Sequence, residues 1–225
     1  MEDPGFEGSS YIHRFTYLHS ACEYTCFGES RHLPARIALP TTGYDRCYVA
    51  RMPPPAGGGA TLSCTQKLRK LLGEPAAPLD VSNPETSIEF YANLLWLDGR
   101  KSLLVAEAQT LFCFLVPDVR KRDLTPIGSI FVPRLEFELV TEGLPKNLFG
   151  SLDPEGIRIA PTSDRAIVGS LVEFGRMCEY RVQDAGGLER ADISLLNHKL
   201  RRTPMARRRR SYIFPIDAAR ALMAH

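Results

Sequence analysis

The sequence contains no hydrophobic run long enough to cross a membrane. Its longest predominantly apolar stretches are Tyr91–Leu97 and Leu111–Val116, whereas a membrane-spanning helix needs roughly 20 apolar residues. The N-terminus is acidic and polar over residues 1–4, and it lacks the basic segment and apolar stretch of a secretory signal. These absences predict a cytoplasmic protein without a membrane partner.

Cysteine is scarce and scattered, which argues against a disulfide framework. Only six cysteines are spread over 225 residues, and a long chain without a secretory signal is expected to keep its thiols reduced. The glycine run at 57–59 is not followed by Gly-Lys-Ser/Thr, so it is not a phosphate loop. No Cys-x2-Cys pair occurs either, and the possible zinc ligands are irregularly spaced; they are His19, Cys22, Cys26, His32 and Cys47. We expect free thiols, no metal site and no cofactor.

Residues 1–59 differ from the rest of the chain. They show little periodicity and end in Pro53–Pro55 followed by Gly57–Gly59, and a stiff segment followed by a flexible one is typical of a linker. We therefore predict a poorly ordered N-terminal appendage over residues 1–59 and a single α+β domain over residues 60–225. A hydrophobic content of 44% and a charged content of 24% are those of an ordinary globular protein.

The strand-like runs of the domain are centred on a hairpin. Asp98-Gly99 separates two apolar, β-prone runs, and this dipeptide favours a type I′ turn because both central positions need a positive φ. Both runs are nearly continuous in apolar residues, which predicts that both faces of the sheet are covered. Strands are expected at 60–64, 88–97, 101–106, 111–116 and 157–160.

Helices are predicted where apolar residues recur every three to four positions. Thr65 is expected to cap the first helix, and Thr162 or Ser163 a later long one, while Pro133 is expected to kink or split the helix between them. The predicted fold class is α+β, an antiparallel meander of three to five strands packed with three to four helices. The residues expected to meet in one core are Phe90, Trp96, Phe114, Leu171 and Phe174.

Several short segments, taken in order, resemble a known family. They are Ser63–Leu68, Tyr91–Leu95, Arg100–Lys101, Thr162–Arg165 running into Gly169–Ser170, Leu196–Asn197 and Pro204–Met205. With these pieces, the chain from about Leu62 to its C-terminus resembles an uncharacterised family of small bacterial domains that is classed only as a domain of unknown function. The resemblance implies a bacterial cytosolic α+β domain. It implies no activity, ligand or catalytic residue.

The positive charge of the chain is concentrated near its C-terminus. The net charge is only +2, yet the segment from Lys199 to Arg210 holds no acidic residue. Clustered arginines neutralise phosphates, and a nearby aromatic ring can stack on an unpaired base. The alternative is a solvated loop that joins two helices. The candidate nucleic-acid residues are Arg201, Arg202, Arg207, Arg208, Arg209, Arg210 and Tyr212.

Two further groups of residues are candidates for chemistry. Cys64 lies at a predicted junction of strand and helix, where a helix N-terminus favours the thiolate. With His198 and Asn197 it forms a conceivable acyl-transfer group, the alternative being a cysteine packed in the core. Asn93, together with Arg100 and Lys101, is a candidate ligand site, the alternative being an amide that bonds a neighbouring loop.

Three functions remain open from the sequence. The first is a non-catalytic accessory or interaction module that acts by contact with another protein, since no catalytic constellation is recognisable. The second is a nucleic-acid-associated protein that uses the arginine stretch. The third is a small hydrolase or toxin-like enzyme that uses Cys64 or the neighbourhood of Asn93 and Arg100.

Overall fold

The computed structural model describes residues 59–73, 88–207 and 211–224. The predicted appendage, apart from Gly59, therefore lies outside the described residues, as do the possible zinc ligands within it. Arg208, Arg209 and Arg210 also lie outside them. Within the described ranges the chain forms five α-helices, a five-stranded sheet and a separate two-stranded sheet.

The main sheet is mixed, which corrects the predicted antiparallel meander. Its strands are β1 (Thr61–Cys64), β2 (Glu89–Leu97), β3 (Arg100–Glu107), β4 (Cys113–Val116) and β5 (Arg158–Pro161). Their order is β4-β3-β2-β1-β5, and β1 runs parallel to both β2 and β5. The meander is confined to β2, β3 and β4, which pair antiparallel. The prediction was wrong at β1 because the chain passes through α1 (Gln66–Leu72) before β2, and such a crossover returns a strand in parallel.

The predicted turn between β2 and β3 is confirmed. Asp98 and Gly99 have φ angles of 51° and 71°, so both central positions lie in the left-handed region that a type I′ turn requires. The turn aligns Leu97 with Arg100 and Trp96 with Lys101 across the two strands. It thereby sets which side chains lie together at the hairpin end.

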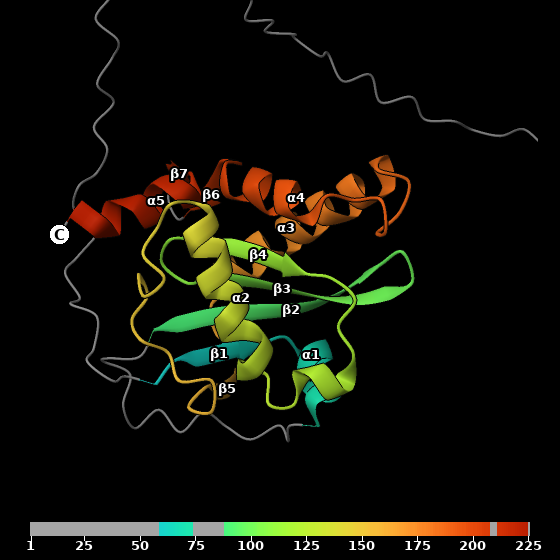
Figure 1. Ribbon diagram of the computed structural model, residues 1–225, viewed down its shortest axis with the longest axis horizontal. Coiled ribbons are helices and arrows are strands. Elements are labelled where there is room, and N and C mark those ends of the chain that lie inside the picture. The colour runs from blue at the N-terminus through green and yellow to red at the C-terminus, as the bar shows by residue number, and fades with distance from the viewer. Residues whose placement is uncertain (1–58, 74–87, 208–210, 225) are drawn as a thin grey trace, which may run out of the picture. The chain divides into compact units, whose positions relative to one another are not determined.

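Helices cover both faces of the sheet, as the apolar strands predict (Figure 1). One face, here called the α2 face, packs against α1, α2 (Gly128–Thr141) and α5 (Pro215–Ala221). The other, the α3 face, packs against α3 (Arg165–Asp184) and α4 (Ile193–Arg201).

The sheet separates the hydrophobic core into two clusters, one on each face, whereas the sequence predicted a single core. Phe90 and Phe114 lie on the α2 face, whereas Leu171 and Phe174 lie on the α3 face. Trp96, predicted to be buried with them, is 58% exposed. It sits one residue from the end of β2, next to the turn of the hairpin.

Pro133 does not split α2, although the sequence suggested that it would kink or divide a helix. A short 3-10 helix at Lys121–Leu124 precedes α2, which then runs unbroken through Pro133. The proline ring is exposed, so water can reach the carbonyl group that loses its donor. No helix among the described residues is long and apolar enough to cross a membrane.

A short antiparallel ribbon, which the sequence did not predict, lies between α4 and α5 in the chain. It consists of β6 (Met205–Arg207) and β7 (Ser211–Ile213), with Arg207 paired to Ser211. A 3-10 helix at Leu222–Ala224 follows α5. Strands of three residues carry too little periodicity to be recognised from sequence, so this ribbon was missed.

Candidate functional site

The structure does not bring Cys64 to His198 and Asn197. Cys64 is buried in β1, while Asn197 contacts β4. Two strands, β2 and β3, separate β1 from β4, and a spacing of about 4.8 Å per strand places them roughly 14 Å apart. Cys64 directs its thiol to the carbonyl oxygen of Leu62 at 3.4 Å. The three residues therefore form no acyl-transfer group in this fold.

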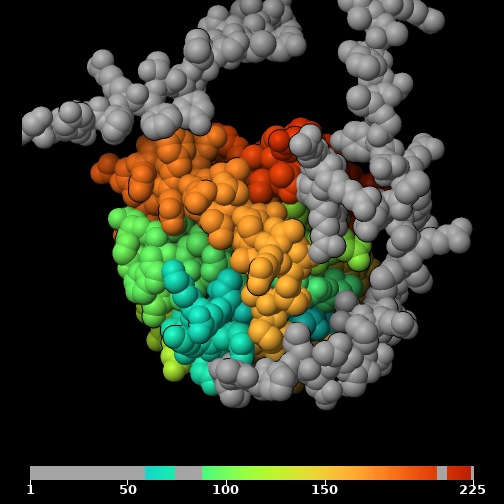
Figure 2. All heavy atoms as spheres, turned by 180° about the vertical axis from the view of Figure 1, so that it is seen from behind, coloured from blue at the N-terminus to red at the C-terminus, as the bar shows by residue number. Residues whose placement is uncertain are grey.

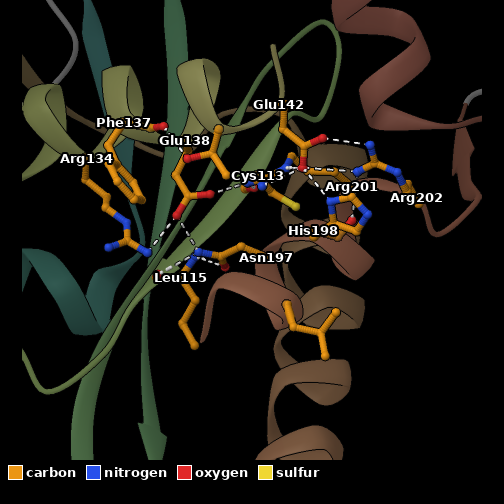
Figure 3. Close-up of polar contacts among 12 residues, drawn as sticks. Cys113, Leu115, Arg134, Phe137, Glu138, Glu142, Asn197, His198, Arg201 and Arg202 are labelled. Atoms are coloured by element: carbon orange, nitrogen blue, oxygen red, sulfur yellow. Dashed lines mark hydrogen bonds and ion pairs between the residues drawn. The ribbon is translucent and has the colours of Figure 1, made fainter. Parts of the chain in front are cut away.

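Asn197 instead pairs with the outer edge of the sheet (Figure 3). Its Oδ1 accepts the backbone N–H of Leu115 at 2.8 Å, and its Nδ2 donates to the Leu115 carbonyl at 3.2 Å. The amide thus bonds β4 much as a neighbouring strand would. An edge strand with unpaired backbone groups is a template for aggregation, so this contact closes that edge.

Arg201 continues the same contact one turn further along α4. The residue is fully buried, and its Nη1 donates to the Cys113 carbonyl at 3.2 Å and to Glu138 at 2.7 Å. Its Nε and Nη2 both donate to Glu142, at 2.9 and 2.8 Å. Buried charges persist only when they are paired and hydrogen-bonded, and here Glu138 of α2 and Glu142, the residue that caps the C-terminal end of α2, meet that need (Figure 3).

The carboxylate of Glu142 also contacts basic side chains in and just after α4. Arg202 donates to both of its oxygens, and His198 Nδ1 lies 3.2 Å from Oε1. Burial on its own would raise the pKa of Glu142, but the hydrogen bonds and charges of Arg202 and Arg201 outweigh it and lower the pKa to about 2. Because its polar groups bond one another, we interpret this cluster as a structural clamp between α2, α4 and β4.

The two glutamates of the clamp were missed by sequence reasoning. Glu138 lies in α2 and Glu142, four residues later, caps its C-terminal end, so both extend from the same side of the helix, and both are buried. A pair of acids at that spacing inside an otherwise apolar helical pattern is the signal that could have marked them. Their arginine partner could not have been chosen from sequence, since Arg201 follows Glu142 at a long separation.

Asn93 lies at a second polar junction, where β1, β2 and the start of α3 meet. Its Oδ1 accepts a hydrogen bond from the Thr65 hydroxyl at 3.0 Å. Nearby in sequence, the hydroxyl of Tyr91 lies 3.1 Å from the Ser163 hydroxyl and accepts the backbone N–H of Asp164 at 3.2 Å. Burial raises the pKa of Tyr91, which keeps it in the hydroxyl form that makes these bonds. The junction fixes where α1 and α3 begin.

The described thiols are placed for packing. Cys113 and Cys178 are completely buried, as the sequence predicted for residues on apolar faces. Burial raises the pKa of both thiols, that of Cys178 to about 12, so neither is a thiolate near neutral pH. Among the residues that the structure describes, no group of three or more His, Cys, Asp and Glu side chains is arranged to hold a metal ion.

Arg100 and Lys101 lie at the hairpin end, away from Asn93. Asn93 pairs with Leu104 in the register of β2 and β3, so roughly 13 Å of strand separates it from Leu97 and the turn. Arg100 bonds Glu189 and, at 3.5 Å, Asp118. Lys101 lies over the indole of Trp96, 5.5 Å from the ring centroid. The three residues of the predicted ligand site therefore lie apart, with Asn93 near the start of α1 and Arg100 and Lys101 at the hairpin end.

A pocket of about 380 Å³ lies between the hairpin end and the C-terminal half of α3. The hairpin is held there because Asp98 accepts the backbone N–H of Leu188 at 3.1 Å. Figure 2 shows the hairpin beside the end of α3 and the chain that follows it. The pocket is lined by Trp96, Leu97, Asp98, Glu179, Val182, Gln183, Gly186 and Gly187.

The candidate nucleic-acid residues fall in different environments. Arg201 and Arg202 are engaged with Glu142, and the structure does not describe the side chain of Arg207. Tyr212 is 66% exposed on β7. The remaining arginines of the run lie outside the described residues.

The fold and these contacts define a small α+β domain with a mixed sheet covered on both faces. A comparison with protein families identifies the family of this domain. The family described as Domain of unknown function (DUF6933) matches residues 61–218, and the chain belongs to that family. No curated protein matches the chain. No solved structure matches it either.

Proposed function

We propose that this domain is a non-catalytic interaction module that binds another protein through the end of its β2–β3 hairpin. The observation that carries this proposal is Trp96, the single tryptophan of the chain, which is 58% exposed. Every other apolar residue of β2 from Phe90 onward is buried. Tryptophan is enriched among the residues that dominate binding energy at protein interfaces.

The surroundings of Trp96 suit a protein contact. Alternation along the strand places Trp96 and Lys101 on one side of the hairpin and Leu97 on the other. Lys101 over the indole holds the ring in place by a cation–π contact. A large side chain that is already ordered loses little conformational entropy when a partner covers it. The nearby pocket adds a concave surface.

Catalysis has less support from the described residues. Asn197, suggested for acyl transfer, bonds the backbone of Leu115, and Arg100, suggested for ligand binding, bonds Glu189 and Asp118. Cys64 is buried in the core, where a cysteine acts as a small apolar residue. A recognition surface therefore accounts for more of the structure than an active site.

Site-specific photo-crosslinking tests this proposal. Benzoylphenylalanine is placed in the native host at position 101, which pairs with Trp96 in the strand register, with the same group at Val172, an exposed residue of α3, as the control. The captured protein is then purified, and its affinity for the full chain is measured. Trp96→Ala should weaken binding by about 30-fold, the scale of a hot-spot residue, while Val172→Ala should leave it unchanged. Equal capture at both positions, or an affinity indifferent to Trp96, would exclude the hairpin end as the docking site.

A nucleic-acid function is a second candidate, favoured by the exposure of Tyr212 next to the arginine run. A two-stranded ribbon fits the major groove of DNA, and exposed aromatic rings stack on unpaired bases. Replacing Arg207–Arg210 with serine should flatten the dependence of DNA retention on salt concentration. An unchanged salt slope would remove this function, and Tyr212→Ala separates stacking from charge.

A further inference from the structure

The pocket beside the hairpin is lined by two acidic side chains and by the exposed side chain of Trp96. Asp98 contributes a carboxylate from the turn, and Glu179 contributes one from α3. The indole of Trp96, which is 58% exposed, supplies apolar surface, since Leu97 and Val182 are almost fully buried. None of the lining residues is cationic, and among the described residues neither carboxylate forms an ion pair.

The cations near the pocket are held elsewhere or lie at its rim. Arg100 interacts electrostatically with Asp98, but its guanidinium hydrogen-bonds Glu189 and Asp118. Lys101 lies over Trp96. Arg190 approaches Gly186 at the rim and bonds neither pocket carboxylate. With respect to the part of the chain that the structure describes, the two acids therefore keep acceptor oxygens available to an incoming cation, since Asp98 hydrogen-bonds there through Oδ2 alone, to the N–H of Leu188.

We propose that this pocket receives a cationic side chain, preferentially arginine, from the protein that docks on the hairpin end. The proposal rests on the proposed interaction function and names the chemistry of the partner. An arginine stem packs on apolar surface such as that of the exposed Trp96 indole. Its planar guanidinium offers five donors, enough to reach carboxylates on two different elements, which a single ammonium group does less well. Charge complementarity of this kind adds specificity to an interface.

The test uses blocked single residues as probes. The isotope-labelled full chain is titrated with N-acetyl-arginine amide, its lysine counterpart and the neutral isostere N-acetyl-citrulline amide. Backbone amide resonances of Gly186 and Gly187, both in the pocket lining, report binding. We expect saturable shifts with arginine amide at millimolar concentration and binding about tenfold weaker for citrulline amide, the scale of one hydrogen bond to a charged group.

Matched glutamate variants locate the interaction. Glu179→Gln should weaken arginine-amide binding about threefold, as for an exposed charge pair. Glu173→Gln removes the same charge from the same helix outside the pocket, where Glu173 pairs with Arg176, and should change nothing. Equal binding of citrulline amide, equal effects of both variants, or no saturable shift would each overturn the proposal. Tighter binding of free agmatine than of arginine amide would also overturn it, in favour of a small-molecule ligand.

The two proposals fail in different ways. A captured partner whose affinity depends on Trp96 but not on Glu179 would overturn the assignment of the pocket and leave the interaction function standing. Selective binding of arginine amide, with no partner that depends on Trp96, would uphold the cation preference of the pocket and overturn the proposed function. Adducts formed only between two copies of the chain would replace the separate partner by self-association.

Discussion

Asn197 of α4 forms two hydrogen bonds with the backbone of a single residue of β4, Leu115, accepting from its N–H and donating to its carbonyl. The same amide also donates to Glu138 at 2.8 Å. One side chain thereby satisfies the hydrogen-bonding groups of a backbone residue in an edge strand and links that strand to α2 and α4. The contact ties together three elements that are far apart in sequence, so it reports on the tertiary structure as a whole.

Asn197→Ala should destabilise the domain by about 2 to 4 kcal/mol, because it leaves buried backbone groups of Leu115 without partners. Thermal and urea unfolding of the full chain measure the loss. Asn147→Ala, at an exposed loop position, is the control and should change stability by less than about 0.5 kcal/mol. Equal effects of the two substitutions would show that the edge contact contributes nothing.

The lowered pKa of Glu142 predicts how stability depends on pH. A carboxyl group with a depressed pKa in the folded state stabilises the fold above its ordinary pKa of 4.5 and loses that contribution as pH falls toward about 2. Urea midpoints measured from pH 5 down to pH 2 should therefore decline. Glu142→Gln should remove part of the decline, whereas Glu155→Gln, at an exposed position, should retain it. If the urea midpoint of Glu142→Gln declined with pH as steeply as that of the unmodified protein, a group other than Glu142 would be responsible for the acid sensitivity.

Gly128 and Gly169 predict opposite effects of the same substitution. A Cβ atom at Gly128 would lie 1.9 Å from the carbonyl oxygen of Pro154, whereas at Gly169 nothing lies within 4 Å. Gly128→Ala should lower stability by about 1 to 3 kcal/mol through overpacking against backbone. Gly169→Ala should raise it by about 0.5 to 1 kcal/mol, since alanine is the better residue in a helix. Chemical denaturation measures the free energy of unfolding of both variants. A change of the same sign in both would contradict the close approach at Gly128.

The three described cysteines, Cys64, Cys113 and Cys178, should resist alkylation in the folded protein. All three are buried, and the raised pKa of Cys113 and Cys178 further suppresses the reactive thiolate. A variant that keeps only these cysteines should take up iodoacetamide at pH 8 only after denaturant is added. Rapid labelling of Cys64 under native conditions, identified by peptide mass, would reopen the thiol hypothesis.

Some local features were predictable because short segments determine them. Asp98-Gly99 specified a type I′ turn through the φ angles that its two residues tolerate. Ile167, Leu171, Phe174 and Cys178 indicated the helix that became α3, although its cap is Asp164, one residue beyond the predicted Thr162 or Ser163. The nearly continuous apolar runs of β2 and β3 indicated a sheet covered on both faces. Each of these features is determined by residues that are close to one another in the sequence.

Relations between distant segments were decided only by the tertiary structure. Nothing local in β1 indicates that it pairs with β5, nearly a hundred residues later, and runs parallel to it. Glu142 and Arg201 meet only because α2 and α4 approach β4 from opposite faces of the sheet. Trp96 looked like a core residue because its neighbours are apolar, yet it is 58% exposed near the end of β2. Periodicity and turn propensity act over a few residues, whereas strand order, ion pairing and exposure depend on which surfaces the whole chain brings together.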